Sequence, residues 1–145
     1  MSNADLAVAC FKEDFNCSQA VFSIYAPMLG LDRETALRVA AAFGGGIGRT
    51  GETCGAASGA LMAIGLRYGQ YTAEDKDAKE KTYDLAAEFL NRFAARNNGC
   101  VKCRELLGHN VGTPEGRQAA REQGLFETLC PKFVRDAAEI VEQLL

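Results

Sequence analysis

The chain has 145 residues, of which 48% are apolar and 24% charged, and its formal net charge is −3. This length and apolar fraction suit one domain with a single hydrophobic core. The mildly acidic balance, with no run of like charges, argues against a nucleic-acid-binding surface, which needs clustered Lys and Arg. The single histidine excludes sites that need two or three histidines from one chain, so the six cysteines are the feature to explain.

The spacing of apolar residues predicts helices almost throughout, and no segment shows the sustained alternation of a strand. A short first helix carries Cys10 on its apolar stripe. Asn16, followed three residues later by Gln19, predicts a capping box at the start of a second helix. Asp32 is a suitable N-cap for a third helix.

A glycine-rich segment, residues 44–52, leads into a helix of unusual composition at residues 53–68. Gly55, Gly59 and Ala63 recur in it every four residues, so one face carries almost no side chains. Such a face lets another backbone or a bound group approach closely. Because apolar residues cover its other faces, we expect this helix to be the central buried one.

The second half of the sequence predicts a long charged helix over about residues 73–97, with Thr72 as its cap. A short helical turn at residues 103–107 and a last helix beginning at Cys130 and Pro131 follow. There is neither an internal repeat nor a linker. The expected fold is therefore an all-α helical bundle, a single domain over residues 1–145 with the Gly/Ala-rich helix at its centre.

The N-terminal residues show neither the basic region nor the apolar stretch of a signal peptide. The longest apolar-rich run, residues 54–66, is too short to span a bilayer. We therefore expect a cytoplasmic protein without membrane insertion. In that reducing compartment, several cysteines more often serve metal binding or redox chemistry than structural disulfides. The simpler alternative for any one of them is a small buried hydrophobe.

Four of the cysteines share a position relative to the expected helices. Cys17, Cys54 and Cys130 lie in or beside first turns, and Cys103 lies at the start of the short turn. The partial positive charge and free N–H groups of a helix N-terminus lower the pKa of a thiol. Cysteines that only filled a core would lie along apolar stripes, as Cys10 does. These four are therefore candidates for one site.

Other local motifs are weak or absent. The spacing of Cys100 and Cys103 is ambiguous between a dithiol couple, half of a metal site and coincidence. Arg104 follows Cys103, so the haem attachment pattern is missing, and we expect no haem. The glycine-rich segment lacks the G-K-[ST] end of a phosphate-binding loop, so no nucleotide is expected. A nest of N–H donors beside Cys54 would instead favour an anion, such as a four-thiolate metal centre.

The block CGAASGALMAIGL, residues 54–66, together with the glycine-rich segment before it, resembles the family of redox-active proteins named for the signature C_GCAxxG_C_C. Thr53 stands where the family name has a glycine. The resemblance runs from about Phe15 to the C-terminus and implies a small, cytoplasmic, helical redox protein. Its four signature cysteines correspond to Cys17, Cys54, Cys103 and Cys130.

A similar domain occurs in split-Soret cytochromes, where corresponding cysteines are assigned to an iron–sulfur centre. The resemblance therefore implies a [2Fe–2S] cluster on the four signature cysteines, serving electron transfer or redox sensing with an unidentified partner protein. Gly51, Gly55 and Gly59 would provide room and N–H donors that tune its potential. Arg49 and Arg104 lie near the cysteines in sequence and could offset cluster charge, although ordinary solvent exposure is the simpler interpretation.

Two alternatives stay open. In the first, the site holds no metal and two signature cysteines cycle between dithiol and disulfide, with Cys54 as the low-pKa thiol. In the second, the four thiolates hold a structural zinc ion, although such sites usually use paired C-x-x-C motifs. Cys10 is expected in the core and Cys100 outside the site. Whether the protein is an enzyme, and whether two chains pair, is not decided by the sequence.

Overall fold

The computed structural model describes all residues, 1–145, and contains nine α-helices, two short 3-10 turns and no strand. The all-α fold is thus confirmed. No helix combines the length and the apolar character needed to cross a membrane. The α-helices are α1 (Asn3–Lys12), α2 (Cys17–Tyr25), α3 (Arg33–Ala40), α4 (Gly55–Tyr68), α5 (Lys76–Arg96), α6 (Cys103–Leu107), α7 (Pro114–Glu122), α8 (Leu125–Thr128) and α9 (Cys130–Leu144).

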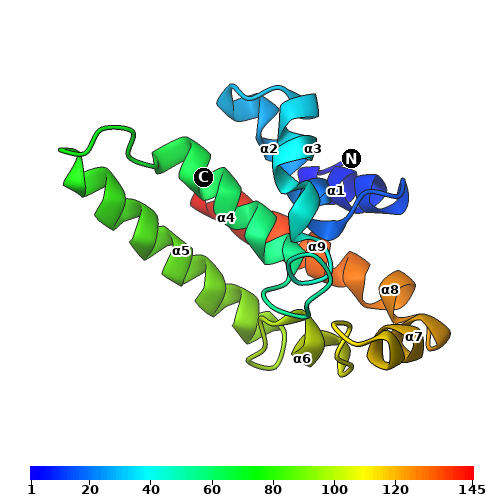
Figure 1. Ribbon diagram of the computed structural model, residues 1–145. Helices are drawn as coiled ribbons and strands as arrows, with labels where there is room; N and C mark the ends of the chain where they lie inside the picture. The colour runs from blue at the N-terminus through cyan, green and yellow to red at the C-terminus, as the bar shows by residue number, and fades with distance from the viewer.

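The Gly/Ala-rich helix α4 is the centre of the bundle, as its composition predicted. It packs against α2, α5 and α9, while α1 packs on α2 and α9 (Figure 1). A Cβ atom added to Gly59 would lie 2.6 Å from the backbone oxygen of Ser18 in α2, so the two helices approach more closely than a side chain would permit. The 28 buried apolar residues form one continuous core.

The long helix α5 begins later than the sequence indicated. Thr72 was the expected cap, but the helix begins at Lys76, and the carboxylate of Asp75 accepts a hydrogen bond from the Ala78 N–H at 3.1 Å. Aspartate is a somewhat stronger N-cap than threonine, and here it lies at the position from which the first turn can be capped.

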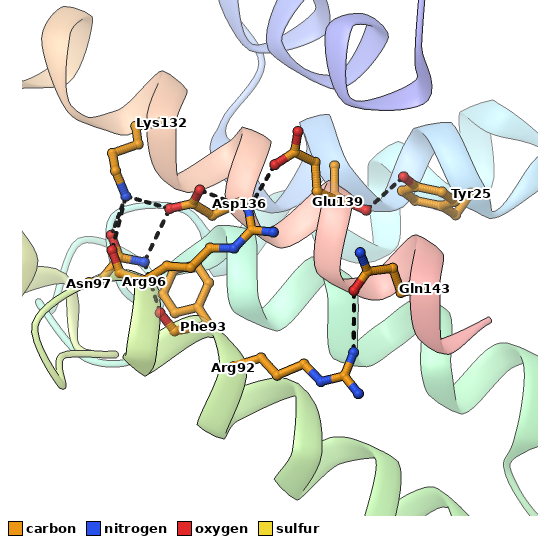
Figure 2. Close-up of polar contacts among 10 residues, drawn as sticks. Tyr25, Arg92, Phe93, Arg96, Asn97, Lys132, Asp136, Glu139 and Gln143 are labelled. Carbon is orange, nitrogen blue, oxygen red and sulfur yellow. Dashed lines mark hydrogen bonds and ion pairs between the residues drawn. The ribbon is translucent and has the colours of Figure 1, made fainter.

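A cluster of polar side chains joins α5 to α9; we call it the Asp136 cluster (Figure 2). The buried Asp136 carboxylate pairs with Lys132 at 2.6 Å and with Arg96 at 3.2 Å, and accepts a hydrogen bond from Asn97 at 3.3 Å. Arg96 also pairs with Glu139 at 2.7 Å. Because each charge of the cluster has a partner within the protein, the contact is complete without any ligand.

The helices α6, α7 and α8 follow one another along one end of the bundle, beside the point where the glycine-rich segment enters α4 (Figure 1). They contribute little to the core, since Cys103, Leu107 and Ala120 are their only buried residues. This peripheral segment therefore lies at one end of the bundle, and Cys103 is its first helical residue.

Candidate functional site

The structure brings the four signature cysteines together. Each lies at the start of a helix: Cys17, Cys103 and Cys130 are the first residues of α2, α6 and α9, and Cys54 is the N-cap of α4. All four line one cavity of about 520 Å³, and none forms a disulfide. This volume lies in the range of small-molecule and cofactor sites, about 300–1,000 Å³.

The other two cysteines lie outside this cavity. Cys10 is buried in the core of α1, where its sulfur lies 3.7 Å from the hydroxyl oxygen of Ser23. The Cys100 thiol donates a long hydrogen bond, 3.7 Å, to the backbone oxygen of Asn98. The two neighbours in the C-x-x-C motif therefore differ, because only Cys103 reaches the cavity.

The capping box predicted at α2 positions Cys17. The Asn16 side chain accepts a hydrogen bond from the Gln19 N–H at 2.9 Å, and the Gln19 side chain accepts one from the Asn16 N–H at 3.0 Å. Cys17 is thereby held as the first helical residue. The backbone N–H groups of Ser18, Gly45 and Ala56, which belong to three different segments, act on its thiolate and lower the pKa of Cys17.

Cys54 and Cys103 are placed by a short antiparallel contact between the segments that precede their helices. Thr53 pairs with Lys102 in an isolated bridge. The Cys54 N–H donates to the oxygen of Val101 at 2.9 Å, and the Cys103 N–H donates to the oxygen of Glu52 at 2.7 Å. Two cysteines 49 positions apart in the sequence are thus held side by side by backbone hydrogen bonds.

The electrostatics make Cys17, rather than Cys54, the acidic thiol. The Cys54 thiol and the three backbone N–H groups stabilise the Cys17 thiolate and lower its pKa to about 7. The same contact raises the pKa of Cys54 well above its ordinary value, because its proton is held by Cys17. This direction is opposite to the expectation for Cys54: burial and the charge of Cys17 also raise the pKa of Cys54, and the backbone N–H of Ala56 offsets them only in part.

Cys103 and Cys130 remain protonated at neutral pH when the site holds no metal. Burial raises the pKa of each to about 12, and the negative charge of the Cys17 thiolate adds to the shift. The charge of Cys103 also raises the pKa of Cys130. The four sulfurs are therefore close enough to influence one another, and binding of a cation would release their protons.

Only one of the three glycines expected at the site lines the cavity. A Cβ atom added to Gly55 would lie 2.5 Å from the Cys17 sulfur, so a glycine is needed there. Gly51 and Gly59 lie elsewhere: Gly51 has φ +76° and lies against Asn110, and Gly59 faces α2. Their role in binding a group at the cavity is not supported, because their backbones serve a turn and a helix contact.

The glycine-rich segment contributes residues that the sequence did not single out. Residues 45–49 all have φ between +59° and +70°, a left-handed path that glycine tolerates and that Ile47, being β-branched, rarely adopts. This path brings the Gly45 N–H to the Cys17 sulfur. A Cβ atom added to Gly46 would lie 2.8 Å from the Cys103 Cβ. The density of glycines in this segment was the available signal.

Arginines give the cavity a positive wall. Arg49 lines it, whereas Arg104 pairs with Glu52 at 3.1 Å and does not. Arg117 and Arg121 of α7, which the sequence did not indicate, line it as well. No Asp, Glu, Lys or His side chain lines the cavity, so its ionisable groups are four thiols and three guanidinium groups.

The four cysteines line the cavity, but their sulfurs do not converge on one point. No three Cys, His, Asp or Glu side chains converge closely enough to hold a single metal ion. Cys17 and Cys54 form one contacting pair, while Cys103 and Cys130 interact with Cys17 through its charge. The arrangement can support thiol chemistry at the contacting pair, or a group large enough to reach all four sulfurs.

Comparison with known families agrees with these positions. No curated protein and no solved structure was found to match the chain. The family model described as "Putative redox-active protein (C_GCAxxG_C_C)" matches residues 15–144, nearly the whole chain, and this range contains all four cavity cysteines. The chain therefore belongs to the C_GCAxxG_C_C family of putative redox-active proteins.

Proposed function

We propose that the protein is an electron-transfer or redox-sensing module that holds a [2Fe–2S] cluster on Cys17, Cys54, Cys103 and Cys130. The observation that carries this proposal is that these four cysteines, and neither of the other two, line one cavity. Four thiolates are the usual ligands of such a cluster, which supplies one-electron chemistry when it is bound.

The surroundings of the sulfurs suit this group better than a single zinc ion. Each of the two irons in the cluster takes two thiolates, and Cys17 and Cys54 already contact one another. A tetrahedral zinc site would need the four sulfurs to move together around one point, since no three of them now converge. The backbone N–H groups at Cys17 and the guanidinium of Arg49 would offset the negative charge of the thiolates.

The proposal is tested on protein purified without oxygen, by visible absorption and by analysis of iron, zinc and acid-labile sulfide. We expect two irons and two sulfides per chain, with visible absorption bands that bleach on reduction. The matched variants are Cys103→Ser and Cys100→Ser, which alter the two thiols of one C-x-x-C motif. Cys103→Ser should lower the iron content at least tenfold, and Cys100→Ser should leave it unchanged. Colourless, iron-free wild-type protein would reject the cluster, and about one zinc per chain would replace it with the zinc site.

A second candidate function, thiol–disulfide exchange, is favoured by the contact between Cys17 and Cys54. The Cys17 thiolate would attack a substrate disulfide and form a mixed disulfide, releasing the first substrate thiolate. Cys54 would then lose its proton and attack the Cys17 sulfur, leaving a Cys17–Cys54 disulfide and the second substrate thiolate. The substrate is reduced by two electrons, and an external dithiol must reduce the protein again.

This candidate makes a different prediction for the iron-free protein. A Cys54→Ser variant should accumulate the mixed disulfide on Cys17, because no second thiol can resolve it, and mass spectrometry would detect the adduct. The Cys103→Ser variant is the matched control and should turn over as the wild type does. If both variants turn over normally, the contacting pair is not the exchanging couple.

A further inference from the structure

The arginines of the chain divide into two groups by their partners. The sequence contains ten arginines, and seven of them either pair with an acidic side chain or lie over an aromatic ring. The three without an acidic partner or an aromatic ring are Arg49, Arg117 and Arg121, and all three line the cysteine cavity. The seven partnered ones are Arg38, Arg92, Arg96, Arg104 and Arg135, which form ion pairs, and Arg33 and Arg67, which lie over aromatic rings.

Arg117 is anchored through one nitrogen of its guanidinium group. Its Nε donates to the backbone oxygen of Val111 at 3.3 Å, and its two terminal nitrogens have no acceptor in the protein. Arg121 lies one turn later on the same helix, and Arg49 comes from the left-handed glycine-rich segment. A guanidinium group is suited to bidentate binding of a carboxylate or a phosphate.

The rest of the cavity surface is mostly apolar. Of the 13 lining residues that are neither cysteine nor arginine, eight are apolar, among them Phe11, Leu106 and Phe126. A cavity with apolar walls and a few convergent polar groups is the usual form of a small-molecule site. The concentration of three positive charges and no negative one contrasts with the net charge of −3 of the whole chain.

We infer that this cavity binds a small organic anion, with its carboxylate or phosphate on Arg117 and Arg121 and its apolar part toward the cysteines. The inference identifies the class of ligand that the cavity binds. It rests on the proposed function only for the statement that redox chemistry takes place in the cavity. Arg49 supplies a third positive charge from the glycine-rich segment. The anion and the cysteines would then share one cavity of about 520 Å³.

Binding is measured by isothermal titration of the full chain at constant ionic strength in KCl. The probes are inorganic phosphate, phenyl phosphate and benzoate. We expect saturable binding with one site, tighter for phenyl phosphate than for inorganic phosphate because the phenyl ring contacts the apolar walls. The comparison of phenyl phosphate with benzoate decides which anionic group the arginines prefer.

The double variant Arg117→Gln/Arg121→Gln should weaken phenyl phosphate binding at least tenfold. The matched control, Arg38→Gln/Arg67→Gln, removes the same charge from exposed positions outside the cavity and should leave binding unchanged. The single variant Arg121→Gln, at an exposed position, keeps the test valid if the double variant does not fold. Absence of saturable binding in the wild type, or equal weakening in both double variants, would overturn the inference. Binding of polyglutamate without binding of the small probes would overturn it too, by assigning the arginines to an acidic protein partner.

A second readout reports on the cysteines themselves in iron-free protein. Iodoacetate is anionic and iodoacetamide neutral, and both alkylate a thiolate with loss of iodide. The ratio of their rates at Cys17 should fall severalfold in Arg117→Gln/Arg121→Gln and stay constant in the control; an unchanged ratio would count against an anion at this cavity. Iron and sulfide content of wild-type protein purified without oxygen reports separately on the cluster. Wild-type protein that retains iron but binds no probe rejects this inference alone, and wild-type protein that binds the probe but holds no iron rejects the cluster alone.

Discussion

The Asp136 cluster and the cysteine cavity differ in whether their ionisable groups have charged partners within the protein. In the cluster, a carboxylate that is 10% exposed meets Lys132 and Arg96 and a hydrogen-bond donor from Asn97 (Figure 2). In the cavity, four thiols and three arginines have no acidic partner at all. The charges of the Asp136 cluster are therefore paired within the protein, whereas the thiols and guanidinium groups of the cavity are available to a ligand or a metal centre.

This difference distinguishes charged groups that stabilise the fold from groups that are available for binding or reaction. Charges that serve stability are paired, because an unpaired buried charge costs several kcal/mol, on the order of 3–5 when one partner of a buried pair is removed. Unpaired cationic groups and thiols with shifted pKa values in a cavity are instead typical of a binding or reactive site. If the two regions are independent, a substitution in one region should leave the chemistry of the other unchanged.

The largest effect is expected at the paired region. Asp136→Ala removes the acceptor of three donors and should lower the free energy of unfolding by about 2–3 kcal/mol, measured by urea denaturation. Glu88→Ala, which breaks an exposed ion pair with Arg92 on α5, is the control and should cost less than about 0.5 kcal/mol. The alkylation rate of Cys17 should be unaffected; a changed rate would show that the two regions are coupled.

The second prediction concerns the close contact of α2 with α4, which sets the positions of Cys17 and Cys54. Gly59→Ala should destabilise by about 1–2 kcal/mol, because overlap with the Ser18 backbone outweighs the gain in helix propensity of about 1 kcal/mol. Gly65→Ala in the same helix meets nothing within 4 Å and should stabilise by about 0.5–1 kcal/mol. Thermal unfolding of the pair would reveal shifts of opposite sign, and shifts of the same sign would contradict the packing described.

The third prediction is a pH dependence that belongs to the cavity alone. In iron-free protein the alkylation of Cys17 should have its midpoint near pH 7. Cys54→Ala removes the hydrogen bond to the thiolate and should raise the pKa of Cys17 toward its ordinary value of 9.0. Cys100→Ala should leave the midpoint unchanged, and a midpoint that ignores Cys54 would refute the assignment of the pair.

The stability of iron-free protein should follow the same groups. Between about pH 7 and pH 9 the folded chain has lost the Cys17 proton and the unfolded chain has not, so the free energy of unfolding rises with pH. Above pH 9 it falls, because the unfolded chain loses thiol protons that folded Cys103 and Cys130 keep until about pH 12. Urea denaturation in a pH series should therefore show a maximum near pH 9, and Asp136→Ala should lower the whole curve without moving this maximum.

The smallest effect on stability is expected for Arg121→Gln. Its side chain is exposed and pairs with no acid, so the free energy of unfolding should change by less than about 0.5 kcal/mol. The same substitution should weaken phenyl phosphate binding severalfold. A large loss of stability would instead assign Arg121 to the packing of α7 and make the cavity more like the Asp136 cluster.

Local rules predicted much of this fold because helix starts depend on neighbouring residues. Asn16 and Gln19 complete a capping box within four positions, and the expected helix begins where they place it. The start of α5 was missed because Thr72 and Asp75 are both acceptable caps, and only the turn between them decides which one is used. The cysteine positions at helix starts followed from the same local reasoning.

The sequence by itself determined the all-α fold, its Gly/Ala-rich central helix and the division of six cysteines into four at helix starts and two elsewhere, since each depends on spacing along the chain. Only the tertiary structure decided that Cys17 is the acidic thiol, because groups that lower its pKa, the Cys54 thiol and the backbone N–H groups of Gly45 and Ala56, belong to other segments. It also decided that Gly55 lines the cavity while Gly51 and Gly59 do not, and that α7 turns two arginines toward it. These features depend on the distances between residues that are far apart in the sequence, which no local pattern records.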